Sequence, residues 1–175
     1  MIAALLFFFA TGQSYTYWVQ PAENADAELA EWALEAWRDA SGGALHLAKA
    51  EDERHAQLRI YWAGAQPGLY GEMRPVWVDG KRGAEVYVLP APKQDDELSR
   101  QAVVYLTCLH ETGHALGLLH TANFDDIMYS FQFGGDIPEY FGRYRRKLKA
   151  RGDIRKTTAL SDIDRKRLAA VLSRN

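Results

Sequence analysis

Three histidines in one short stretch have the spacing of a zinc site. The sequence HETGHALGLLH runs from His110 to His120 and has the form HExxH followed by xxGxxH. On an α-helix, His110 and His114 lie one turn apart on the same face, and this spacing suits Zn²⁺. With His120 as a third ligand, one coordination position stays open, as a catalytic zinc requires. The stretch therefore predicts a catalytic zinc centre.

Two further residues of this stretch have types that fit hydrolysis. Glu111 is set about 100° round the helix from His110, so its carboxylate can act on a water molecule instead of binding the metal. Gly117 can take the left-handed conformation that ends a helix, and the chain can then turn back to bring in His120. We expect hydrolysis of peptide bonds by metal-activated water, with Glu111 as the general base.

The extended motif resembles that of the metzincin zinc proteases, which also have a methionine turn beneath the metal. Residues 125–129 read DDIMY, so Met128 resembles the turn methionine; simple core packing is the alternative. Tyrosine directly after methionine is similar to the matrixin branch. In the astacin-like branch a metal-binding tyrosine stands one residue later, where this chain has Ser130, so no tyrosine ligand is expected.

The elements that must position these residues follow from hydrophobic periodicity and turn residues. Strands are expected at 15–19, 44–48, 57–62, 76–78 and 83–89, and helices at 23–40, 97–116 and from Ser161 onward. The resemblance implies an α+β metzincin catalytic domain. Its sheet would be twisted and mostly parallel, with four or five strands, an antiparallel edge strand and three main helices. In that family substrate adds to the edge strand, and 76–78 or 83–89 would play this part.

The length of the chain, its net charge and its first residues limit which broad class of protein it can be. A chain of 175 residues suits one domain, and a net charge of −2 gives no indication of nucleic-acid binding. The apolar run at 1–10, MIAALLFFFA, has the length of a signal-peptide core and is too short to span a membrane. We expect a signal peptide at 1–12, a single catalytic domain at 13–175, and a secreted or periplasmic monomer. An apolar first strand or an uncleaved anchor is the alternative.

The segment 134–158 departs from the family pattern because eight lysines and arginines face only three acids. One interpretation is a solvated helix and loop. The other is a basic patch near the cleft that recruits acidic substrates or an anionic surface. The residues after the methionine turn, Ser130 to Phe133, lack the proline usual in matrixins. Side-chain preference therefore cannot be transferred from the family.

Other metal sites and a disulfide framework find little support in the sequence. Cys108 is the single cysteine, and a buried apolar position is expected for it. Only His46 and His55 remain outside the motif, too few for the three-histidine structural zinc of animal matrix metalloproteinases. Asp79 could ligate calcium, but Asp79-Gly80 fits a hairpin turn better. Zinc is thus the one expected cofactor, and calcium is unsupported.

Two other functions compete with proteolysis. The first is a zinc-holding binding domain that has lost catalysis, although such a domain has no need of Glu111. The second is hydrolysis of an amide in a non-protein substrate such as a cell-wall peptide. The expected partner is otherwise a peptide or protein substrate.

Overall fold

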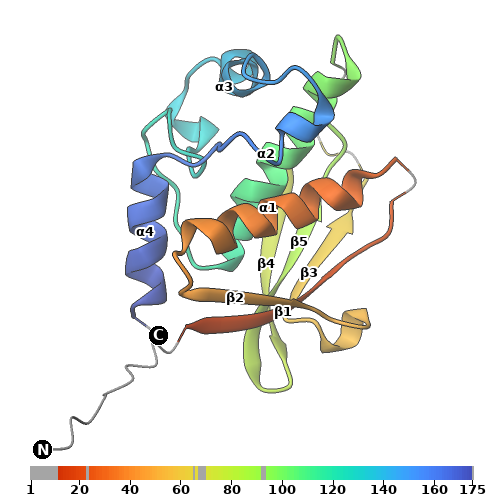
Figure 1. Ribbon diagram of the computed structural model, residues 1–175, viewed down its shortest axis with the longest axis vertical. Helices are drawn as coiled ribbons and strands as arrows, with labels where there is room; N and C mark the ends of the chain where they lie inside the picture. Colours follow the sequence, from red (N-terminus) through yellow and green to blue (C-terminus); the bar gives the residue numbers. More distant parts are fainter. Residues whose placement is uncertain (1–11, 23, 65, 67–69, 92–93, 175) are drawn as a thin grey trace, which may run out of the picture.

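The computed structural model describes residues 12–22, 24–64, 66, 70–91 and 94–174. The predicted signal peptide, apart from Gly12, lies outside the described residues. Along these residues, one strand and one helix are followed by four strands and then by three α-helices (Figure 1). No helix among the described residues combines the length and the apolar character needed to cross a membrane.

Within the described ranges, five strands form one sheet in the order β2-β1-β3-β5-β4. Their bounds are β1 Gln13–Val19, β2 Leu45–Lys49, β3 Leu58–Trp62, β4 Gly71–Val78 and β5 Lys81–Val88. The pairs β1–β2, β1–β3 and β3–β5 are parallel, and β4 pairs with β5 antiparallel. The predicted mostly parallel sheet with an antiparallel edge strand is confirmed, and the edge strand is β4, not β5.

Among the residues that the structure describes, four α-helices accompany the sheet, one more than the three main helices expected. They are α1 Asp26–Ala40, α2 Glu97–Ala115, α3 Ile137–Arg145 and α4 Asp162–Leu172. Helices α1 and α2 lie against the same face of the sheet, while α4 stands to one side (Figure 1). The extra helix α3 has only nine residues and lies in the basic segment 134–158.

The core lies between the sheet and the two long helices. Alternate residues of the central strands, such as Ile60 and Val86, are completely buried there. Trp37 of α1 is also completely buried, and its indole N–H donates to the carbonyl of Leu109 on α2 at 2.9 Å. Because α2 carries the histidine motif, this packing fixes the helix that the predicted site depends on.

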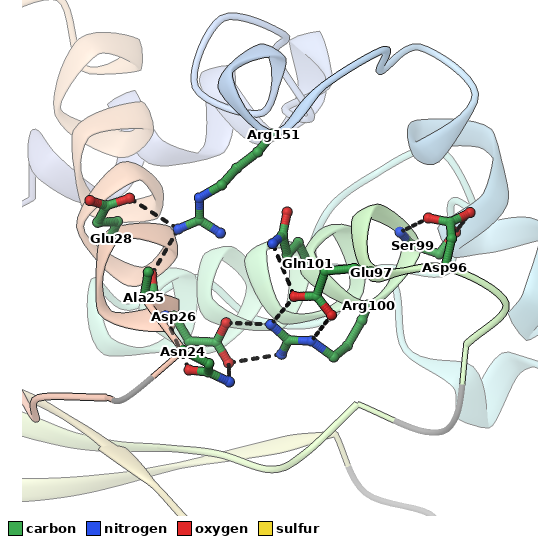
Figure 2. Close-up of polar contacts among 10 residues, drawn as sticks. All are labelled: Asn24, Ala25, Asp26, Glu28, Asp96, Glu97, Ser99, Arg100, Gln101 and Arg151. Atoms are coloured by element: carbon green, nitrogen blue, oxygen red, sulfur yellow. Dashed lines mark hydrogen bonds and ion pairs between the residues drawn. The ribbon is translucent and has the colours of Figure 1, made fainter.

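The start of α1 has no side-chain cap. The N-cap residue is Ala25, in a left-handed conformation with φ of 61°, and no side chain caps the helix. The Asp26 carboxylate instead accepts two hydrogen bonds from Arg100 of α2, at 2.7 and 2.8 Å (Figure 2). Asp26 is therefore used to join α1 to α2, and this charge-assisted bidentate pair offsets its burial.

Strand β4 begins at Gly71, before the predicted start at residue 76, and it includes Pro75. Leu89 N–H donates to the Tyr70 carbonyl, whereas Ala84 N–H and the Val88 carbonyl bond toward β3. Pro75 pairs with Ala84, and because the Ala84 N–H bonds toward β3, this pair exchanges no backbone hydrogen bonds. The Pro75 nitrogen therefore lies on the free edge of the sheet, where no donor is needed. A stretch that contains a proline therefore continues as a strand.

The basic segment 134–158 is held to the rest of the domain by ion pairs. Four of its arginines lie beside carboxylates outside the segment: Arg143 by Asp125, Arg145 by Asp96, Arg151 by Glu28 and Arg155 by Glu35. A fifth, Arg146, pairs with Glu139 inside the segment. Arg151, for example, reaches Glu28 and the Ala25 carbonyl at the start of α1 (Figure 2). This pairing offsets much of the positive charge and favours the first interpretation over a free basic patch.

Candidate active site

Helix α2 positions His110, Glu111 and His114. Its first turn is capped by Asp96, whose side chain accepts a hydrogen bond from the Ser99 N–H at 2.7 Å. The helix ends before Gly117, which has a φ of 101°. Only glycine adopts this conformation readily, and it lets the chain reverse toward His120 as predicted.

The three histidines converge at one point. Nε2 of His120 lies 3.2 Å from Nε2 of His110 and 3.0 Å from Nε2 of His114. Within the part of the chain that the structure describes, these three residues form the only group of three or more potential metal ligands. The predicted triad is therefore brought together by the fold.

The opposite ring nitrogens are held by backbone carbonyls. His110 Nδ1 lies 2.7 Å from the Ile127 carbonyl, and His114 Nδ1 lies 2.8 Å from the Leu118 carbonyl. A carbonyl can only accept, so each Nδ1 carries the proton and each Nε2 turns its lone pair to the centre. This is the tautomer that a metal ligand requires.

The geometry of the triad fits zinc. Two nitrogen ligands of a tetrahedral zinc ion, each about 2.0–2.1 Å from it, lie roughly 3.3–3.4 Å apart. The two Nε2 separations of 3.0 and 3.2 Å are close to this value. Burial lowers the pKa of His110 to about 4 and also lowers the pKa of His114 and His120. All three rings are thus neutral at pH 7 and able to bind a metal.

Glu111 lines the same cleft as the three histidines. The residue is 8% exposed, and burial, together with the nearby charge of Glu72, raises the pKa of its carboxyl to about 7. A carboxyl with this pKa can take up and release a proton near neutral pH. Strand β4 passes close by, since a Cβ on Gly71 would lie 3.0 Å from Glu111 Oε1.

Met128 is completely buried beside α2. A Cβ added to Gly113 would come within 2.5 Å of Met128 Sδ and 3.0 Å of the Trp37 ring. Glycine between the two helical histidines therefore makes room for the predicted turn methionine. The roles of Gly113 and Gly71 were not predicted from the sequence. For Gly113 a signal was present, because a glycine inside a helix usually has a packing or functional reason.

A cleft of about 550 Å³ opens beside the triad. Its lining includes Tyr70 just before β4, Phe131 after the methionine turn, and Tyr140 and Phe141 of α3. Phe133, which also follows the methionine turn, is 54% exposed and lies outside this lining. Because α3 belongs to the segment that departs from the family pattern, its aromatic contribution was not foreseen.

Two other residues singled out from the sequence lie outside this chemistry. Cys108 is completely buried, and burial raises the pKa of its thiol, as its expected packing role implies. Asp79 and Gly80 have φ values of 49° and 74°, which is the conformation of a tight hairpin turn between β4 and β5.

Comparisons with known proteins agree with this architecture. The crystal structure of archaemetzincin from Methanopyrus kandleri superposes with a TM-score of 0.53 and 13% identity, covering 96% of this chain and 99% of that chain. At this identity the likeness shows the fold alone. A comparison with curated proteins gave no match. The family model for matrixin, a family of zinc metallopeptidases, matches residues 12–135. The chain therefore belongs to the matrixin family.

Proposed function

We propose that this protein is a zinc-dependent endopeptidase. The observation that carries the proposal is the convergence of His110, His114 and His120 in one cleft with Glu111. The histidines would hold the metal through Nε2, as their fixed tautomers allow. A zinc ion in this position supplies Lewis acidity, which lowers the pKa of water and polarises a scissile carbonyl.

Glu111 would act as the proton carrier. Its carboxyl has a pKa of about 7, so it can accept a proton from the attacking water and later donate it to the leaving amine. The enclosing cleft walls reduce competition from bulk water at this carboxylate.

Strand β4 would hold the substrate in an extended conformation. The alternation of bonds to β5 leaves the backbone groups of Gly71 and Met73 on the free edge of the sheet. An extended peptide can add to such an edge as a further strand. Gly71 also lies against Glu111, so a peptide bound there would pass directly beside the proposed general base.

Action outside the cytoplasm belongs to the same proposal, because residues 1–10 read as a signal-peptide core. Two alternatives remain: a zinc-holding domain without catalysis, and an amidase for cell-wall peptides. The proton-transferring pKa of Glu111 favours catalysis over simple binding. The free edge of β4 favours a polypeptide substrate.

The test is a measurement of zinc content together with digestion of casein and a fluorescent peptide library. We expect one zinc per chain, cleavage that stops with a chelator, and recovery when zinc is returned. The Glu111→Gln variant should keep its zinc and lose activity by about 100-fold or more. Zinc binding without cleavage by the wild type would favour the binding domain. Cleavage of cell-wall peptides alone would favour the amidase.

A further inference from the structure

The backbone carbonyl of Ile127 joins the histidine triad to helix α3. It accepts a hydrogen bond from His110 Nδ1 at 2.7 Å and another from the Tyr140 hydroxyl at 3.1 Å. The same hydroxyl lies 3.2 Å from the Asp126 carbonyl. Because both of these partners are carbonyls, Tyr140 is the donor in each contact.

The preceding peptide group, between Asp126 and Ile127, is also held by hydrogen bonds. The Ile127 N–H donates to Asp164 Oδ2 at 2.8 Å, and Ile127 is only 2% exposed. Tyr140 thus contacts the Ile127 carbonyl and also the carbonyl of the peptide group before it, whose N–H is bound by Asp164. The backbone leading to the Ile127 carbonyl is therefore held in place. A carbonyl fixed in this way also fixes the plane of the imidazole that donates to it.

Tyr140 itself has little freedom to move. It is 4% exposed, and its ring lies 5.2 to 5.9 Å, between centroids, from the rings of Phe124, Tyr129, Phe131 and Phe141. Arg143 lies over the same ring at 4.6 Å from its centroid. The hydroxyl is thus presented to Ile127 by a ring that packing holds in place.

We propose that Tyr140 is a positioning residue for the metal centre, acting through the Ile127 carbonyl to orient His110. The inference rests on the proposed zinc site. Tyr140 lies beyond residues 12–135, the part that matches the matrixin model. The segment 134–158 is therefore a working part of the centre as well as a surface addition held by ion pairs.

The expected effect follows from the number of bonds between Tyr140 and the metal. Groups that bond directly to a ligand typically change metal affinity by about 10- to 100-fold. Tyr140 is one bond further out, so Tyr140→Phe should weaken zinc binding by about 10-fold, at the lower end of this range. The ring remains in this variant, so the aromatic packing around it is retained.

Tyr144 offers a matched control on the same helix. It is 3% exposed, and its hydroxyl donates to the carbonyls of Ile154 at 3.0 Å and Thr157 at 2.9 Å. Tyr144→Phe therefore also removes a buried hydroxyl bonded to two backbone carbonyls. Neither of its partners contacts a histidine of the triad, so a general loss of stability is separated from an effect on the centre.

The experiment measures zinc affinity by competition with a chromophoric chelator, and the visible absorption of the cobalt-substituted proteins. The Tyr140→Phe variant should bind zinc about 10-fold more weakly than wild type and show a shifted cobalt band, whereas Tyr144→Phe should match wild type in both.

Equal affinities and spectra for the two variants would overturn the inference. So would a Tyr140→Phe protein that does not fold, because the hydroxyl would then hold the fold and not tune the centre. A wild type that binds no zinc would instead remove the proposed function on which the inference stands.

Discussion

Gly71 of β4 and Glu111 of α2 are in such close contact that no side chain fits between them. A Cβ on Gly71 would lie 2.7 Å from Glu111 Cγ and 2.9 Å from Thr107 Cγ2. Separations under 3 Å force something to move, and two of the three nearest atoms belong to the Glu111 side chain, which has rotatable bonds. The edge strand thus sets the position of the proposed general base.

Gly71→Ala is therefore expected to lower peptidase activity by roughly 10- to 100-fold, because small misplacements of a reacting group have effects of this size. Zinc content should stay at the wild-type level, since the three atoms nearest to the added methyl group belong to Glu111 and Thr107 and not to a histidine. Hydrolysis of a fluorogenic peptide and metal analysis on the same sample would measure both. Gly64→Ala is a suitable control, because a Cβ there meets no atom within 4 Å. Wild-type activity in Gly71→Ala would show that Glu111 tolerates displacement.

The pH dependence of stability offers a second test, made on the metal-free protein. Folding raises the pKa of Glu111 from 4.5 to about 7, chiefly through burial. A group whose pKa is higher in the folded than in the unfolded protein stabilises the fold at pH values below the unfolded pKa. This contribution is lost as pH rises from about 4.5 to 7. Glu111→Gln has no such titration. Its stability relative to wild type should therefore increase between pH 5 and pH 8, by up to roughly 3 kcal/mol.

Urea unfolding of both proteins in the presence of a chelator, at pH 5 and at pH 8, measures this difference. The three histidines have lowered pKa values and titrate in the opposite sense, but they are present in both proteins and cancel in the comparison. A stability difference that does not change with pH would mean that Glu111 titrates as an exposed carboxyl.

The sequence predicted the parts of the site that depend on local spacing. The separation of His110 and His114 by one helical turn, and the left-handed Gly117, need only backbone geometry, and both are present. The strand β4 was only partly predicted, because the Pro75 nitrogen is tolerated for a reason that lies in the pairing of β4 with β5.

The contribution of α3 could not be predicted from the sequence. Tyr140 reaches the Ile127 carbonyl only through the tertiary packing of an aromatic cluster. A run of arginines dominates the same segment, and their role depends on partners as distant in sequence as Glu28 and Glu35. Charge counted along the chain does not show which residues meet in the fold.

Zinc should stabilise the wild-type fold strongly. A ligand at 1,000 times its dissociation constant stabilises by about 4 kcal/mol, which in a domain of this size raises the melting temperature by roughly 8–16 °C. His120→Ala should lose most of this shift, because only two ligands remain. His55→Ala should keep it, since His55 is exposed and bonds Asp52. Calorimetry with and without zinc distinguishes the variants, and an undiminished shift in His120→Ala would point to a different ligand set.

Asp164 joins helix α4 to the methionine turn, and its removal should destabilise the fold. The residue is completely buried, and its Oδ2 accepts hydrogen bonds from the N–H groups of Ile127 at 2.8 Å and Ser161 at 2.9 Å. Asp164→Ala leaves both donors without this partner, and each buried unsatisfied group costs about 1–3 kcal/mol. We expect the free energy of unfolding, measured in urea, to fall by roughly 2–5 kcal/mol, with a smaller loss for Asp164→Asn, which keeps an acceptor oxygen.

The control is Asp162→Ala. Asp162 is exposed in the same helical turn, so this variant should change stability by well under 1 kcal/mol. Equal losses for Asp162→Ala and Asp164→Ala would show that helix-end charge, and not the bonds to Ile127 and Ser161, accounts for the effect.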